Sequence, residues 1–253
     1  MDLGLERTAA IVCGASAGMG LAISRALAAE GCDVTMVARD PDRLDAAASS
    51  VPGAVASAGD VRDQAAMERA VKATIDRRGR LDILINNAGG PPAGTFDELP
   101  AEAWAEAFEL SLNSAVRLTR LALPHLRESG RGRIVNITSW SVREPIPHLM
   151  LSNAIRPGVV GWAKALSREV AGDRITVNTV APGKVDTERM KELWERQPDP
   201  ENARARDEAS IPAGRLGSPD EIAAAVTFLC SAQAAYISGV VLPVDGGALQ
   251  GIW

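Results

Sequence analysis

The sequence has few aromatic residues, histidines or cysteines. Phe, Trp and Tyr make up 4% of its 253 residues, and it has two histidines, one tyrosine and three cysteines. The cysteines, Cys13, Cys32 and Cys230, are odd in number and far apart, which fits neither a disulfide framework nor a zinc site. We therefore expect no metal site and a reducing compartment.

The sequence also lacks long runs of one charge and long apolar runs. Its 27 basic and 32 acidic residues give a net charge of −5, and the densest basic stretches, residues 77–80 and 131–133, are short. A nucleic-acid partner would need a basic face. No apolar run reaches the roughly 20 residues that span a bilayer, and no secretory signal is visible near the start. We expect a cytoplasmic protein without a nucleic-acid or membrane partner.

Apolar runs alternate with helix-like stretches along the whole chain. The expected strands are residues 8–13, 33–38, 54–58, 81–86, 132–137, 175–180 and 240–244. The expected helices are residues 19–30, 40–50, 63–78, 100–111, 116–129, 159–170 and 219–230. This alternation predicts an α/β fold, a single doubly wound Rossmann domain over residues 1–253. Its seven-stranded sheet should be mostly parallel, with helices on both faces.

One long segment, residues 184–217, carries no strand pattern and is rich in Glu, Arg and Pro. We expect it to be irregular. A long loop of this kind is often a lid over a substrate, and a merely mobile surface loop is an equal alternative.

The first expected strand runs into a glycine-rich turn with Gly14, Gly18 and Gly20. Glycines let backbone N–H groups approach a pyrophosphate, and the start of the following helix favours negative charge. The pattern therefore predicts a dinucleotide site at this turn.

This turn resembles the cofactor motif of the short-chain dehydrogenases/reductases, and the resemblance extends from about Gly4 to Gly247. Three further motifs occur in the family's order: Asp60-Val61, Asn86-Asn87-Ala88-Gly89, and Pro182-Gly183 with Val185 and Thr187. The resemblance implies these cofactor-binding residues: Gly14, Ser16, Gly18, Met19, Gly20, Arg39, Asp60, Val61, Asn87, Ala88, Gly89, Pro182, Gly183, Val185 and Thr187.

The residue after the second strand favours NADP(H) over NAD(H). An acidic residue there would hold the ribose hydroxyl of NAD, whereas an arginine suits the phosphate of NADP. The sequence has Arg39 at this place, and Asp40 directly after it weakens the preference.

The resemblance also implies a catalytic group, and here the sequence departs from the family. Asn113 and Ser139 match the family's Asn and Ser, but Ser152 and Arg156 stand where its Tyr-x-x-x-Lys motif is expected, and the one tyrosine is Tyr236. A phenol near a lysine can supply a proton near working pH, whereas a serine hydroxyl is a far weaker acid. Ser139 and Ser152 could still donate hydrogen bonds to an oxyanion, and Arg156 could stabilise charge.

Two nearby residues bear on this site. Pro157 follows Arg156 and disfavours helical geometry before it, so we expect a kink or a helix start near Pro157. His148 lies four residues before Ser152, and it is an alternative proton donor or only a surface histidine.

These features predict an NADP(H)-dependent oxidoreductase. It would transfer hydride to a small carbonyl, enone or imine, with the proton coming from water, His148 or the substrate. Two alternatives stay open: an NADP(H)-binding sensor or partner subunit without redox turnover, and a lyase or isomerase. The resemblance implies a homodimer or homotetramer that uses the strand at residues 240–244, and the apolar tail Ile252-Trp253 suits such an interface.

Overall fold

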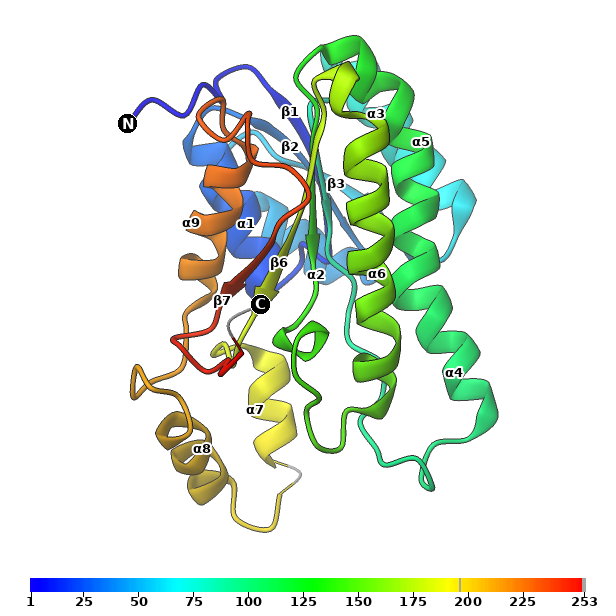
Figure 1. Cartoon of the computed structure of the whole chain (residues 1–253). Helices are drawn as coiled ribbons and strands as arrows, with labels where there is room; N and C mark the ends of the chain where they lie inside the picture. Colours follow the sequence, from blue (N-terminus) through cyan, green and yellow to red (C-terminus); the bar gives the residue numbers. More distant parts are fainter. Residues whose placement is uncertain (196, 252–253) are drawn as a thin grey trace.

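The computed structural model describes residues 1–195 and 197–251, so Ile252 and Trp253 lie outside the described residues. One seven-stranded sheet forms the centre (Figure 1), in the order β3-β2-β1-β4-β5-β6-β7. Its strands are β1 Ala9–Cys13, β2 Asp33–Ala38, β3 Val55–Ala58, β4 Ile83–Asn86, β5 Arg133–Ile137, β6 Thr176–Pro182 and β7 Val241–Val244. Every strand pair is parallel. The predicted fold is confirmed, with a fully rather than mostly parallel sheet.

Helices cover both faces of the sheet, which is why the central strands are apolar and buried. One apolar core joins the sheet to α1 (Gly18–Ala29), α2 (Pro41–Ser49) and α9 (Pro219–Cys230). A second core joins the other face to α3 (Gln64–Arg78), α5 (Ser114–Ser129) and α6 (Met150–Glu169). Figure 1 shows α1 and α9 on one side of the sheet and α3, α5 and α6 on the other.

The strand order reverses direction between β1 and β4, and all strands end at the same edge. In open α/β sheets, ligands bind in the crevice at the carboxyl ends of the strands where the order reverses. This carboxyl edge therefore collects every loop in which the sequence predicted a cofactor or catalytic residue.

The helix near Pro157 differs from the prediction. α6 runs without interruption from Met150 to Glu169 with Pro157 inside it, so a helix start near Pro157 was wrong, whereas the alternative, a kink there, stays a prediction. A proline in a helix removes one backbone hydrogen bond, here to the carbonyl of Asn153. The packing of α6 against the sheet and α4 outweighs this loss.

The segment 184–217 is less irregular than expected. It contains α7 (Glu188–Glu195) and α8 (Pro200–Ala209), which enclose a small apolar cluster of Trp194, Ala203, Ile211 and Leu216. The polar sequence of this segment did not indicate these helices, because each helix buries little apolar surface. They lie below the carboxyl edge in the view of Figure 1.

After a loop at residues 87–100, the connection between β4 and β5 is one continuous helical rod. It passes from α4 (Ala101–Phe108) through a π-helical turn, η1 (Glu109–Asn113), into α5. Short 3₁₀ turns, η2 (Trp140–Val142) and η3 (Ala171–Asp173), flank α6. No helix among the described residues is both long and apolar enough to cross a membrane.

Candidate active site

The glycine-rich turn is locked against the end of β4. Gly14 has a φ of +61°, and a Cβ there would lie 2.6 Å from the backbone oxygen of Asn87. A Cβ on Gly20 would lie 2.1 Å from the backbone oxygen of Gly14. The Asn87 amide in turn donates to the backbone oxygen of Cys13 over 3.1 Å. Glycine is therefore required at positions 14 and 20. The contacts with Asn87 fix the conformation of this turn at the carboxyl edge of the sheet.

The loop after β6 closes the other side of this turn. A Cβ on Gly18 would lie 3.5 Å from Cγ2 of Thr187. Gly183 lies against Asp245, because a Cβ there would meet the Asp245 Cα at 2.7 Å. Pro182 ends β6, and Val185 forms an isolated parallel bridge with Gly217. The glycine turn and the predicted nicotinamide segment thus lie side by side, as the motifs require.

Other predicted cofactor residues line the same edge. Ser16 and Met19 lie half-buried in the turn and the first turn of α1. Ala88 and Gly89 follow β4, and a Cβ on Gly89 would meet nothing within 4 Å. A bound dinucleotide would need such open space beside the loop that carries this motif.

The residues after β2 and β3 carry the charges of the site. Arg39 is exposed, and it makes no side-chain hydrogen bond or ion pair within the described part of the chain. Asp40 is the N-cap of α2, where its carboxylate accepts from the Arg43 N–H at 3.1 Å. The Asp60 carboxylate accepts from Arg62 at 2.7 Å, which lowers the Asp60 pKa. Both carboxylates are engaged, whereas the guanidinium of Arg39 remains available.

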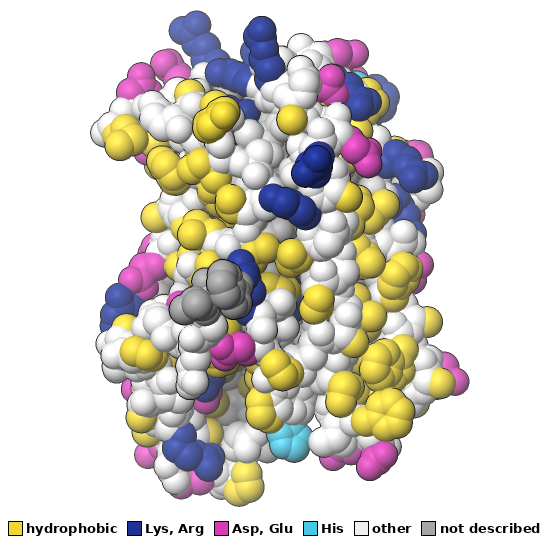
Figure 2. Space-filling model, viewed as in Figure 1, with side chains coloured by type: hydrophobic (Ala, Val, Ile, Leu, Met, Phe, Trp, Pro, Cys, Tyr) yellow, Lys and Arg dark blue, Asp and Glu magenta, His cyan; other side chains and the backbone are white. Residues whose placement is uncertain are grey.

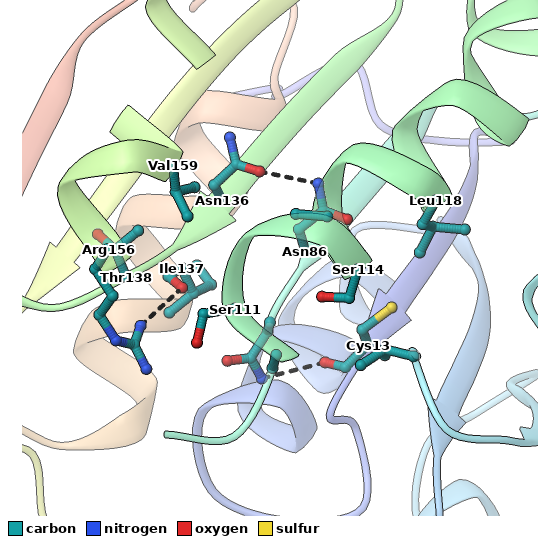
Figure 3. A pocket seen from close by; sticks show the side chains of 14 residues that line it. Cys13, Asn86, Ser111, Ser114, Leu118, Asn136, Ile137, Thr138, Arg156 and Val159 are labelled. Carbon is teal, nitrogen blue, oxygen red and sulfur yellow. Dashed lines mark hydrogen bonds between the residues drawn. The ribbon is translucent and has the colours of Figure 1, made fainter. Parts of the chain in front are cut away.

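A small cavity of about 20 Å³, room for about one water molecule, lies between β4, β5, η1 and α6. Figure 3 shows the side chains that line it. Four of them, Val61, Asn87, Ala88 and Arg156, were predicted site residues. The polar lining also includes Asn86, which belongs to a predicted motif, and four residues that were not predicted, Ser111, Ser114, Asn136 and Thr138. One sequence signal for this lining was available. Asn86 and Asn136 are polar residues near the ends of two otherwise apolar strands, which end at Asn86 and Ile137.

Arg156 is the charged group of this cavity. Its Nη1 donates to the backbone oxygen of Ile137 over a long 3.5 Å, and its Nε is buried without a partner among the described residues (Figure 3). The Ser111 hydroxyl, which lines the same cavity, is also buried and unpartnered there. Burial lowers the pKa of Arg156 to about 10, so it stays cationic at neutral pH. The cavity therefore holds a positive charge that no described carboxylate neutralises.

Ser152 and Arg156 share one face of α6, because they are four residues apart in an unbroken helix. Ser152 is buried in the first turn of α6. Ser139 caps the 3₁₀ turn after β5, where its hydroxyl accepts from the Ser141 N–H at 3.2 Å. No hydrogen bond joins the two serine hydroxyls within residues 1–195 and 197–251. They lie on adjoining elements, since α6 packs against η2.

Asn113 and His148 are not among the residues that line the cavity. Asn113 ends the π-helical turn, and its amide donates to Glu109 at 2.8 Å rather than into the cavity. A π-helical turn inside a helix often marks a functional site. His148 is exposed before α6, with a φ of +60°. Neither side chain forms a hydrogen bond with Arg156 in the described structure.

Comparisons with known proteins agree with this geometry. The family model described as enoyl-(acyl carrier protein) reductase matches residues 14–248. The 3-oxoacyl-[acyl-carrier-protein] reductase FabG of Vibrio cholerae is 38% identical over 248 residues, which is 97% of this chain and 98% of that protein. Dehydrogenase/reductase SDR family member 4 of Bos taurus is 34% identical, covering 97% of this chain and 88% of the relative. The chain belongs to the short-chain dehydrogenase/reductase family.

A solved structure of this family has the same fold over its full length. L-Sorbose reductase from Gluconobacter frateurii, solved with NADPH and L-sorbose, superposes with a TM-score of 0.93 at 33% identity and covers 100% of both chains. These relatives are reductases, and the chain is an oxidoreductase of the short-chain dehydrogenase/reductase type. That Ser152 and Arg156 stand in place of the family's tyrosine and lysine stays a prediction from the sequence.

Proposed function

We propose that this short-chain dehydrogenase/reductase uses NADP(H) to reduce a small carbonyl, enone or imine without a tyrosine as proton donor. The observation that carries the proposal is Arg156, a half-buried cation at the cavity whose Nε is fully buried and which has no carboxylate partner among the described residues. Holding this positive charge away from water costs desolvation free energy. Such a charge suits a site where the substrate becomes negatively charged during the reaction.

The residues at the carboxyl edge fit NADP(H). The glycine turn leaves no room for side chains against Asn87, and Gly89 borders open space. Arg39 is free to pair with a 2′-phosphate, while Asp40 is occupied as a helix cap. When bound, this coenzyme supplies or accepts a hydride.

The chain's own groups would then stabilise the oxygen or nitrogen of the substrate. Arg156 offers a charge-assisted hydrogen bond from Nε, and Ser139 and Ser152 offer neutral ones. We assign none of these groups as the proton donor, because a serine hydroxyl is a far weaker acid than a phenol and Arg156 acts as a fixed cation. The proton then comes from water, from His148 or from the substrate. An enone suits this site because its reduction first produces an enolate.

The test is oxidation of NADPH at 340 nm against a panel of carbonyls, enones and imines. Native enzyme should turn over at least one class, and Ser152→Ala and Arg156→Met should lower kcat/KM by about 100-fold or more, as loss of an oxyanion donor does. A Ser152→Tyr/Arg156→Lys variant is the comparison. If only that variant reduces carbonyls, the native chain is an NADP(H)-binding sensor or partner subunit. Turnover of a substrate with no change in coenzyme redox state would mean a lyase or isomerase.

Segment 184–217 is proposed as the substrate lid. Lys184 pairs with Asp207 at 2.6 Å, and the Trp194 indole donates to the same carboxylate at 2.8 Å. These contacts join α7 and α8 into one unit that directly follows the predicted nicotinamide segment. Asp207→Asn should therefore raise KM for the organic substrate more than KM for NADPH.

A homodimer or homotetramer is also proposed. β7 is a sheet-edge strand whose residues are only partly buried, and a partner copy would cover it. Light scattering tests this assembly, and a monomer would contradict it. We further propose a cytoplasmic location, with which the free, buried Cys13, Cys32 and Cys230 agree. Cell fractionation tests it.

A further inference from the structure

A second and larger cavity, of about 380 Å³, lies at the amino edge of the sheet. Its wall is formed by the starts of β4 and β5, the segment near Gly4, the turn at Arg174 and the segment after α9. This volume is in the range of small-molecule sites. Arg133 at this wall and Ser139 are six residues apart along β5, about 20 Å at the rise of a strand. The cavity is therefore separate from the coenzyme edge.

The cavity has one carboxylate among its described lining residues, and that carboxylate is already saturated. Asp82 is 1% exposed and accepts from Arg80 Nε at 2.7 Å, from Arg131 Nε at 3.3 Å and from the Ala9 N–H at 2.9 Å. Arg80 pairs with both oxygens of this carboxylate. The negative charge of Asp82 is thus balanced by Arg80, which is not among the lining residues.

Arg133 is a buried cation without a described acidic partner. It is 6% exposed, and its Nε and Nη1 donate to backbone oxygens, those of Ser231 at 3.3 Å and Gly132 at 2.9 Å among them. Its Nη2 makes no hydrogen bond to the described residues. Backbone carbonyls orient the guanidinium but do not neutralise it, and burial without a counter-charge is costly.

Arg131 and Arg174 add two more charges to the same wall. Besides Asp82, the Arg131 side chain reaches only the Gly4 oxygen, at 3.5 Å, within the described chain. Arg174 is exposed, and its side chain makes no hydrogen bond there. Figure 2 shows both basic and acidic side chains along the upper edge of the molecule, which is the amino edge in Figure 1, but Asp82 is the one acidic residue among the described lining residues of the cavity. The lining therefore has an excess of positive charge.

We propose that this amino-edge cavity binds a small molecule through a phosphate or carboxylate group held by Arg131, Arg133 and Arg174. The forked donors of arginine match both oxyanions, and the lining supplies apolar surface from Leu5, Ile83 and Ala235 for the remainder of the ligand. The site does not depend on the proposed reductase activity.

Isothermal titration with inorganic pyrophosphate and with citrate, at constant ionic strength, tests the proposal on the native protein with its coenzyme site filled by NADP⁺. One saturable site is expected, and the better probe tells phosphate from carboxylate. Arg131→Gln and Arg174→Gln should each weaken its Kd about tenfold, as loss of a charge-assisted hydrogen bond does. Both substitutions affect side chains near the surface and spare the buried Arg133.

Two controls locate the site. Arg69→Gln, which removes an exposed positive charge on α3, should leave Kd unchanged. Arg39→Gln should also leave it unchanged, because Arg39 lies at the coenzyme edge. No saturable binding of either probe would overturn the proposal. So would binding that survives Arg131→Gln/Arg174→Gln, or that is lost with Arg39→Gln.

Discussion

The Asn86 side-chain amide donates a hydrogen bond of 2.9 Å to the side-chain oxygen of Asn136, its neighbour across β4 and β5. Both residues are buried, and Asn136 continues the link to the backbone oxygen of Asn178 in β6. Asn86 directly precedes Asn87, which holds the glycine turn. This polar ladder therefore fixes the strand ends from which the coenzyme loops start.

Asn136→Ala should destabilise the protein, because it leaves the Asn86 amide short of an acceptor in a buried place. The expected loss is about 2 kcal/mol of unfolding free energy, or about 4–8 °C in Tm for a chain of this size. Thr119→Val is the matched control, because it removes the weaker, 3.2 Å acceptor of the same amide. Equal losses in the two variants would contradict a leading role for the Asn86–Asn136 bond.

Substitutions at Gly14 and Gly89 should separate folding of the turn from coenzyme binding. Gly14→Ala places a Cβ 2.6 Å from the Asn87 oxygen at a positive φ, so we expect lower Tm and loss of NADPH binding. Gly89→Ala meets no described atom within 4 Å and should leave Tm unchanged. If the open space at Gly89 is where NADPH lies, fluorescence titration should still show weaker binding in Gly89→Ala.

The sequence predicted the fold and the cofactor loops because both depend on local pattern. Strand alternation, the glycine turn and the motifs after β4 and β6 can be recognised within a few residues. The helix through Pro157 could not be predicted this way, because packing with the sheet and α4 decides it. Likewise, the roles of Asp40 as a cap and of Ser111 as an unpartnered cavity hydroxyl depend on contacts in space.

The two residues after β2 should respond differently to substitution. Arg39→Gln should raise KM for NADPH by about tenfold or more and leave KM for NADH nearly unchanged, because only NADPH carries the 2′-phosphate. Asp40→Asn should change neither KM, since asparagine also caps helices, whereas Asp40→Ala should cost about 1 kcal/mol of stability. A marked loss of NADH affinity in Asp40→Asn would instead make Asp40 a ribose ligand.

Acid should weaken the start of α9 through Glu221. The Arg215 guanidinium, 2.6 Å away, and the Ser218 N–H hold the pKa of Glu221 at about 2, below its usual value near 4.5. Since the folded pKa is the lower one, the stabilisation is complete above pH 4.5 and is lost as the pH falls towards 2. The Tm gap between native protein and Glu221→Gln should therefore shrink from pH 6 to pH 3. A gap that stays constant would show that the charge of Glu221 is not involved.

Arg156 should lower the free energy of unfolding, although it serves the proposed activity. Its guanidinium is half-buried, with a fully buried Nε and no described counter-ion, and its pKa of about 10 reflects the cost of desolvation. Arg156→Met keeps most of the side-chain volume and removes the charge, so we expect unfolding free energy to rise by about 1–2 kcal/mol, a Tm increase of about 2–8 °C. Activity with NADPH should fall at the same time.

Arg156→Lys distinguishes charge from shape in this prediction. A lysine keeps the cation, so it should lack the stability gain, and it cannot offer the forked donors of arginine. Calorimetry of the three proteins without coenzyme provides the comparison. If Arg156→Met is instead less stable than native, the guanidinium contributes more through its contact with the Ile137 oxygen than it costs in desolvation. Arg156 would then be a structural residue, and its place at the cavity would no longer support an oxyanion role.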